Sequence, residues 1–537
     1  MEQTSVDFGS AEAMGSQPTA RSTIGSTTTV SQPATRPALD DLLSVVLDKP
    51  VAPRQVDDSK PVASDLVQRF LHSQHLGESL LAWGELCGLD VRTVGAEKIR
   101  QRLQIDIAKI DALVSEQVNA IIHHPRFQKL EASWRGLHYL VKQVEDPEAD
   151  QVKVRVLQWS WSELVKDLDA IEFDRSEIFR KVYTNEFDMP GGEPFGLLIG
   201  DYEVWPFPSP QHRHDDVSTL ALMAEVAAAA FSPFITACSP QMFGLTRFDD
   251  LQRVEQLGGG FEQLDYLKWR ALRDSEDARF LGLTLPRALM RLPYDNPATT
   301  AGFVFNEDVS GNDSSKRLWG NSAYVYGGVV IRAFRNSAWL ADTLGIRHGV
   351  EGGGLVTDLP RVSCPTDRAG VVPRLVTEVV VAEDQEAELA ELGFLPLSAC
   401  HDTGDAAFLS AHSVQRPKRY DNPSATANAH LSSLLHYVLC TSRFSHYVKV
   451  LARNKVGQFT DAQACEQFLQ RWVTQYVTLD SDASPRVLAE RPLRDAQVQV
   501  REHPRKPGAF QCIFHLSPHY QLERLVAQIK FTTNLAK

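Results

Sequence analysis

Four side chains that can bind a metal ion stand close together in the stretch QHRHDD, residues 211 to 216: His212, His214, Asp215 and Asp216. A His-x-His pair can hold zinc from one strand, but no third and fourth ligand follows at a diagnostic interval. Asp215 and Asp216 stand directly before an alanine-rich apolar run, where aspartate commonly caps a helix. We therefore predict a helix start here and no metal site, with a metal-dependent enzyme as the weaker alternative.

Two triple glycines are the next candidates for chemistry, because glycine-rich loops often bind phosphate groups. Residues 258–260 and 352–354 both lack the lysine and hydroxyl of a P-loop and the GxGxxG spacing of a dinucleotide site. The stretch GVEGGG, residues 349 to 354, is instead predicted to form a backbone corner with a positive φ angle or very close packing. We hypothesise a local ion pair beside it, between Arg347 and Glu351.

No nucleophile stands in a recognisable catalytic setting. The chain has no GxSxG elbow, its seven cysteines are scattered singly, and Glu383 and Asp384 lie in a polar run typical of a solvated helix face. The adjacent His123 and His124 precede Pro125 and are interpreted as a helix end. We assign no catalytic, cofactor-binding or metal-binding residue, and we predict that the chain is not an enzyme and uses no cofactor.

The composition is that of a soluble globular protein. The 537 residues suffice for two or three packed cores, and 43% are hydrophobic and 23% charged. No stretch reaches the roughly 18 apolar residues of a membrane helix, and the N-terminus lacks the basic and apolar regions of a secretory signal. Single cysteines suit a reducing cytoplasm, and a net charge of −13 disfavours a nucleic-acid coat. We predict a cytoplasmic protein that neither enters a membrane nor binds nucleic acid.

The chain begins with a segment that differs from the rest. Residues 1–60 are rich in Ser, Thr, Pro, Gln and Ala, and this composition predicts a flexible tail. Within it, DDLLSVVLDKP (40–50) is a short apolar island. It either folds back on its own chain or docks on a partner as an added strand.

A helical arm is predicted for residues 61–145. Its first long helix has apolar residues at steps of three and four and is expected to stop at His123 and His124. A second amphipathic helix begins directly afterwards. The apolar positions of the first helix are Ile99, Leu103, Ile107, Ile110, Val114, Val118 and Ile121; those of the second are Phe127, Leu130, Trp134, Leu137 and Val141.

Residues 146–410 are predicted to form an α/β domain. In QVKVRVLQW (151–159), valine at every second position predicts a half-buried strand. Further strands are predicted within 195–204, 232–240 and 281–286, and helices within 215–230 and 321–345. Strands and helices in alternation indicate a sheet with helices on its faces.

Residues 411–537 are predicted to form a C-terminal domain of helices followed by strands. Helical periodicity covers 424–456 and 462–477, and three strand-like runs follow at 496–503, 509–516 and 525–533. The fold class is therefore mixed α/β (α+β), with a helical N-terminal arm, a central α/β domain and a C-terminal domain of helices and strands.

Several of these segments, in this order and at about this spacing, resemble the large subunit of the type VI secretion contractile sheath (the TssC/VipB family, also called EvpB or ImpC). They include HHPRFQKLEASWRGLHYLV, FGLLIGDYEV, LGLTLPRALMRLPY, LWGNSAYVYGGVVIRAF, GVEGGGLVTDLP, RFSHYVKVLARNKVGQF and LSPHYQLERLVAQIKF. The resemblance covers about residues 110–535. It implies a contractile-sheath fold and a structural role without an active site.

The resemblance also implies partners. These are a small sheath subunit (TssB/VipA-like), other copies of the chain, an inner tube protein (Hcp-like), a baseplate, and an AAA+ unfoldase (ClpV-like) that dismantles the contracted sheath. Strand pairing between subunits is expected at the N-terminal tail and the C-terminal strands.

Two interaction surfaces follow from the same resemblance. The first long helix, through Ile99, Leu103, Ile110 and Val114, is expected to pack either on the small subunit or on its own domain. The basic end of the 424–456 helix is expected either to face the tube or to be a solvated face. Its residues are Arg443, Lys449, Arg453 and Lys455.

Some of the chain departs from the family pattern. The region before about residue 95 does not match closely, the tail is longer than expected, and VWPFPSPQHRHDD (204–216) is expanded. These departures favour, as an alternative, a divergent paralogue with a minor or non-polymerising adaptor role.

Overall fold

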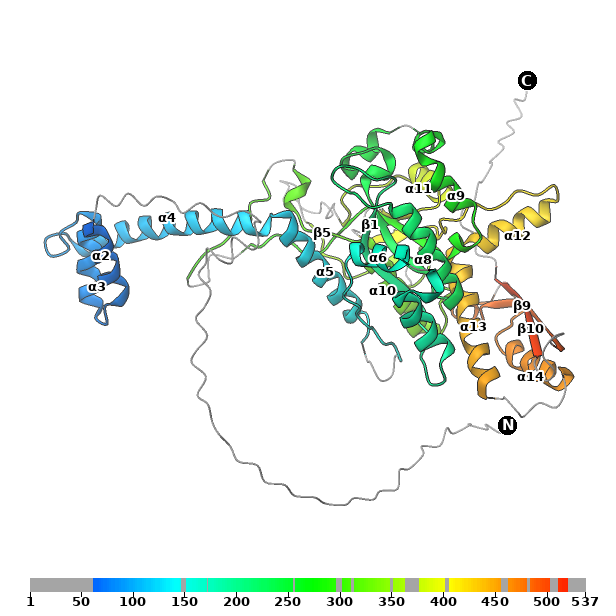
Figure 1. Cartoon of the computed structure of the whole chain (residues 1–537). Coiled ribbons are helices and arrows are strands. Elements are labelled where there is room, and N and C mark those ends of the chain that lie inside the picture. The colour runs from blue at the N-terminus through cyan, green and yellow to red at the C-terminus, as the bar shows by residue number, and fades with distance from the viewer. Residues whose placement is uncertain are drawn as a thin grey trace, which may run out of the picture. The chain divides into compact units, whose positions relative to one another are not determined.

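The computed structural model describes residues 61–145, 151–170, 172–254, 256–295, 302–310, 313–347, 351–362, 376–400, 405–454, 462–480, 483–502 and 510–519. The predicted tail, its 40–50 island and the predicted strand at 525–533 lie outside these residues. Figure 1 shows the arrangement of the elements.

A six-stranded sheet forms the centre of the α/β domain, with strand order β1-β2-β3-β7-β8-β6. The first four strands in this order are parallel, and β8 and β6 are antiparallel to their neighbours. The predicted α/β sheet is confirmed. Its strands are β1 (Leu198–Val204), β2 (Phe234–Cys238), β3 (Leu281–Leu285), β6 (Leu355–Val356), β7 (Leu395–Ala399) and β8 (Ala406–Phe408).

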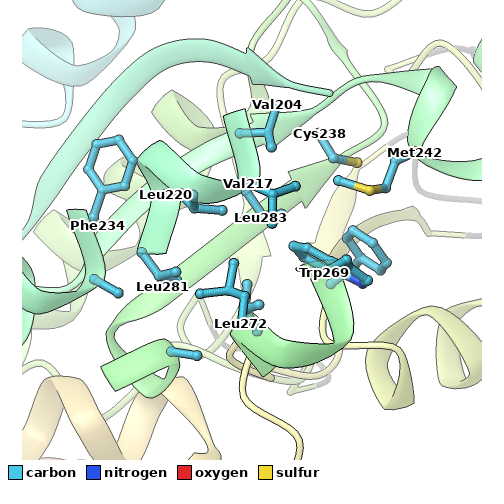
Figure 2. Packing of buried hydrophobic residues seen from close by; sticks show 14 of the residues in the cluster. Val204, Val217, Leu220, Phe234, Cys238, Met242, Trp269, Leu272, Leu281 and Leu283 are labelled. Carbon is cyan, nitrogen blue, oxygen red and sulfur yellow. The ribbon is translucent and has the colours of Figure 1, made fainter. Parts of the chain in front are cut away.

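Helices cover both faces of this sheet. Successive residues of a strand point to opposite faces, and in β2 the side chain of Phe234 packs with α8 (Asp216–Ala230), whereas Ile235 packs with α10 (Ser322–Ser337). Figure 2 shows the core on the face of the sheet that α8 covers, where Val217 and Leu220 of α8 lie near strand residues such as Phe234 and Leu281. The domain is therefore a three-layer sandwich.

The helical and C-terminal parts also follow the sequence. The predicted long helix at 424–456 is confirmed over its described residues but interrupted, because Leu434 adopts an extended conformation between α12 (Pro423–Ser433) and α13 (Leu435–Asn454). β9 (Leu493–Glu502) and β10 (Phe510–Pro518) form an antiparallel hairpin. Apart from short 3-10 helices, the other helices are α2 (Pro61–His72), α3 (Leu76–Cys87), α4 (Ala96–Ile122), α5 (Pro125–Lys142), α6 (Trp161–Ala170), α7 (Glu177–Phe179), the π-helix η2 (Arg180–Asp188), α9 (Leu267–Asp274), α11 (Glu383–Glu391), α14 (Ala462–Thr474) and α15 (Pro485–Glu490). The other strands are β4 (Ala288–Leu289) and β5 (Trp319–Gly320).

Two sequence predictions of secondary structure are wrong. Residues 151–160 form no strand, although their valines alternate as expected. The helix predicted over 321–345 ends at Ser337, because Ala338 has a φ angle of 61° and closes the helix. None of the helices in the described ranges is long and apolar enough to cross a membrane.

Candidate interaction surfaces

The stripe predicted on the long helix of the arm lies on α4 and is largely uncovered. Of the four residues assigned to the interaction, Ile110 is 59% and Val114 37% exposed, while Ile99 and Leu103 are partly buried. Ile107 nearby is 54% exposed. Exposed apolar stripes of this kind mark surfaces that contact another molecule.

The second arm helix, α5, presents part of its predicted apolar stripe outward, while Tyr139 and Leu140 near its end are buried. Leu130 and Trp134 are 57% and 67% exposed, whereas the small residues Ala132 and Gly136 are buried. The reason is close packing on α10: a Cβ added at Gly136 would lie 2.3 Å from Cδ2 of Tyr324. Sequence periodicity identified the apolar stripe of α5 but not that part of it faces outward. The face that packs on α10 is lined partly by small residues, which contribute little to a hydrophobic pattern.

α4 and α5 meet at His123 and His124, and the predicted helix end there is confirmed. His123 closes α4, and its Nε2 lies 3.1 Å from Oε1 of Glu307. Nδ1 of His124 accepts a hydrogen bond from the backbone N–H of Arg126 and thereby caps α5. The two histidines therefore separate α4 from α5.

A buried ion network holds this joint, and sequence reasoning missed it. Nε of Arg291 donates to Glu131 of α5 at 2.8 Å, and Nη2 donates to Glu307 at 3.1 Å. The Arg291 and Glu307 side chains are only 5% and 1% exposed. The network, together with His123, joins the end of α4, the first half of α5 and the chain at Arg291 and Glu307. We call these four residues the arm joint.

The charges of the arm joint stabilise one another. Burial by itself raises the pKa of the Glu307 carboxyl, but hydrogen bonds from Arg291 and from the backbone N–H of Tyr294 outweigh it, so the net pKa lies below its usual value. Burial likewise lowers the pKa of Arg291, and its bonds to Glu307 and Glu131 raise it above the ordinary value. Both groups are therefore ionised at neutral pH.

The basic end of α13 is used partly for contacts inside the chain. The guanidinium of Arg443 lies 5.4 Å from the ring centre of Phe334 and 4.7 Å from that of Tyr447. Nζ of Lys449 donates to Asp188 at 2.8 Å, and Nη2 of Arg453 donates to the carbonyl of Phe187 at 3.2 Å. The fourth predicted residue, Lys455, lies outside the described residues. Lys449 remains 35% exposed, which leaves its charge accessible to a partner.

The glycine corner is confirmed as a backbone feature. Gly353 has a φ angle of 61°, and a Cβ at Gly354 would lie 2.0 Å from the carbonyl oxygen of Phe408 in β8. The N–H of Gly354 donates to the carbonyl of Gly345 at 2.8 Å. Only glycine fits where two chain segments approach this closely.

The ion pair hypothesised beside this corner is wrong. Arg347 pairs with Asp342, at 3.0 Å for Nη1 to Oδ2, and the Glu351 carboxylate accepts a hydrogen bond from Thr357 at 3.3 Å. Asp342 also accepts the backbone N–H of Gly353. Its carboxylate therefore serves both the arginine and the corner.

The histidine and aspartate group at 212–216 forms the start of α8, as predicted. Asp215 caps the helix by accepting the N–H of Ser218 at 3.2 Å. The fully buried Asp216 accepts from Nε1 of Trp161 at 2.6 Å and from the backbone N–H of Trp205, and its Oδ1 lies 2.7 Å from Nε2 of His212. His212 stacks on the Trp205 ring. Within the ranges described above, no three such residues are grouped as metal ligands.

Comparison with known families identifies the two large domains. Residues 104–415 match the EvpB/VC_A0108 tail sheath N-terminal domain, and residues 424–535 match the tail sheath gpW/gp25-like domain of the same family. A helix-flanked sheet domain followed by a domain of helices and a hairpin is thus the architecture of a tail-sheath protein.

A curated relative agrees with this class. The chain is 42% identical over 434 residues to the type VI secretion system sheath protein TssC1 of Pseudomonas aeruginosa, a match that covers 80% of this chain and 85% of that protein. The chain belongs to the EvpB/VC_A0108 family of type VI secretion sheath proteins and is a sheath large subunit, which confirms the resemblance seen in the sequence.

Proposed function

We propose that this large subunit forms heterodimers with a small sheath subunit in the cytoplasm, that the heterodimers polymerise around an inner tube, and that contraction of the polymer drives effector delivery. Its work is mechanical, without a catalysed reaction or a cofactor. The observation that carries the proposal is the tandem match of both tail-sheath domains across residues 104–535. A helical polymer arises when head-to-tail contacts repeat without closing.

The small subunit binds α4 in this proposal. Support comes from the exposure of Ile110 and Val114 on a helix whose other apolar positions, Ile99 and Leu103, continue the same stripe. A stable interface buries about 800 Å² on each partner, and α5 adds the exposed Leu130 and Trp134. The two helices together offer a surface for one partner.

The proposal extends to the other parts of the chain. The basic end of α13, including the partly exposed Lys449 and Arg453, faces the tube and positions it by charge complementarity. A baseplate and an AAA+ unfoldase are further partners. Residues 1–60 act as a tail, 61–145 as the arm, 146–410 as the central domain and 411–537 as the C-terminal domain.

Co-expression with the small-subunit candidate, followed by electron microscopy, tests the proposed function. We expect regular hollow tubules. A soluble complex without tubules would favour the non-polymerising adaptor. Stoichiometric metal, lost when His212 and His214 are both replaced by alanine, would favour the enzyme alternative.

A further inference from the structure

Residues 152–158 are an extended stretch whose backbone is unpaired in the described structure. Among the described residues, no hydrogen bond reaches the backbone N–H or C=O groups of this stretch. Val154, Val156 and Leu157 are 37%, 68% and 49% exposed. Seven residues are a normal length for a strand, so this stretch has the sequence and length of a strand but lacks its neighbour. We call it the open strand.

Side chains hold the open strand in place from one face. Lys153 and Arg155 both form ion pairs with Glu193, and Arg155 also pairs with Glu186 at 2.5 Å. At the far end, the hydroxyl of Tyr202 donates to the carbonyl of Trp159 at 2.8 Å. Because side chains alternate along an extended chain, anchoring Lys153 and Arg155 turns Val154 and Val156 the other way.

Such a stretch is prepared for pairing with a strand from another chain. Unpaired main-chain groups in an extended conformation are a template for an added strand, and folded proteins usually cover or shorten them. Here the ion pairs of Lys153 and Arg155 and the bond from Tyr202 already restrain the stretch, so less conformational entropy is lost when a partner strand binds.

A second copy of this chain is a poor occupant. Every antiparallel register that pairs two or three of the valines Val152, Val154 and Val156 between copies also places Lys153 or Arg155 opposite a basic residue of the other copy. In-register parallel pairing does the same. Like charges directly opposite each other on neighbouring strands are destabilising.

The small sheath subunit fits better, because the open strand follows its proposed docking surface closely in the chain. Of the 29 exposed large hydrophobic side chains in the described residues, 16 lie between Val67 and Leu157. The open strand follows α5 in the chain, and α5 carries the exposed Trp134 and Val141. Ten residues lead from the end of α5 at Lys142 to Val152, which limits their separation to about 35 Å, so one partner that covers α5 can also reach the open strand.

We propose that a strand of the small sheath subunit pairs with the backbone of residues 152–158 and places apolar side chains against Val154 and Val156. This inference rests on the proposed function, because it takes the small subunit as the partner. It adds the main-chain site at which the two chains join.

Hydrogen–deuterium exchange of the purified full chain, alone and with the purified small subunit, tests the pairing directly. Alone and at low concentration, the amides of 152–158 exchange without protection. With the small subunit bound, alternate amides slow by about tenfold or more, since a paired N–H must open before it exchanges. Val156→Asp weakens binding by about tenfold or more, because it places a carboxylate in the interface. The control Val380→Asp, at a valine that is 41% exposed elsewhere, leaves binding unchanged.

Four outcomes overturn the inference. Protection in the lone dilute chain would show a partner inside the chain, and protection that rises with the chain's own concentration would show a second copy. If the small subunit binds while the amides of 152–158 stay unprotected, and Val156→Asp binds it as the wild type does, the pairing is refuted but the proposed function still stands. If the wild-type chain does not bind the small subunit at all, the proposed function itself fails, and the pairing fails with it.

Discussion

The arm joint should lose much of its stability when Arg291 is replaced by methionine. This change removes the cation but keeps the length of the side chain, so that Glu307 and Glu131 remain as two carboxylates without their shared partner. Glu307 is the more affected, because its side chain is 1% exposed, whereas that of Glu131 is 13% exposed.

The size of the expected loss of stability follows from how deeply the Glu307 carboxylate is buried. Breaking a buried ion pair by removing one partner costs about 3–5 kcal/mol, because an uncompensated charge stays behind. Glu307 keeps its hydrogen bonds from the N–H of Tyr294 and from His123, which places the cost at the lower end, about 3 kcal/mol. Adding Glu307→Gln removes the stranded charge, so the double variant is expected to be more stable than the sum of the two single variants predicts.

Hydrogen–deuterium exchange at the backbone amides of Tyr294 and Glu307 measures this loss of stability locally. The Tyr294 N–H donates to the Glu307 carboxylate, and the Glu307 N–H donates to the Tyr294 carbonyl at 2.8 Å. A cost of about 3 kcal/mol corresponds to exchange about 100-fold faster at these amides. The control is Arg416→Met, since Arg416 pairs with Asp274 at the surface, where both side chains are about half exposed. It is expected to change stability by under about 1 kcal/mol. Equal effects of the two variants would refute the assignment of the arm joint.

Three further predictions concern the corner, a buried histidine and the arm. Gly354→Ala should destabilise the domain by about 3 kcal/mol in thermal unfolding, because the new Cβ meets a carbonyl oxygen at 2.0 Å. Gly259→Ala, which meets nothing within 4 Å, is its control, and equal melting temperatures would contradict the prediction. Burial lowers the pKa of His446 from 6.5 to about 4, so the unfolded chain binds the extra proton first and stability falls by about 3 kcal/mol as the pH drops between these values. In urea unfolding, the free energy of unfolding of His446→Asn should depend less steeply on pH than that of the wild type, and an unchanged slope would count against the role of His446. Ile110→Asp should abolish small-subunit binding in a pull-down without lowering the melting temperature of the lone chain, whereas Ile346→Asp, at an isoleucine 46% exposed, should bind normally; retained binding by Ile110→Asp would exclude α4 from the interface.

The sequence predicted elements well where local pattern decides them. The caps at His124 and Asp215 and the strands β1, β2 and β3 lie where turn and cap residues or apolar runs indicated. The alternation in 151–159 was also real, but a strand needs a neighbour to pair with, and no local pattern reports whether one exists in the same chain.

Long-range partners were beyond the sequence. Arg291 meets Glu131 across 160 positions, and no spacing rule links them. Arg347 had two carboxylates near it in sequence, and Asp342 rather than Glu351 is its partner because the turn at Gly345 brings it close. The outward face of α5 follows from the fit of Gly136 against Tyr324, which hydrophobicity alone cannot rank.

The division of the arm at His123 and His124 affects how force would pass along it. A continuous helix resists tension through its repeating backbone hydrogen bonds. At this boundary the ladder is interrupted, and the side chains of Arg291, Glu307 and Glu131 add contacts beside the covalent backbone. Buried charges are screened far less by dissolved salt than exposed ones. We therefore expect the side-chain part of this connection to change little with ionic strength, even where exposed ion pairs weaken.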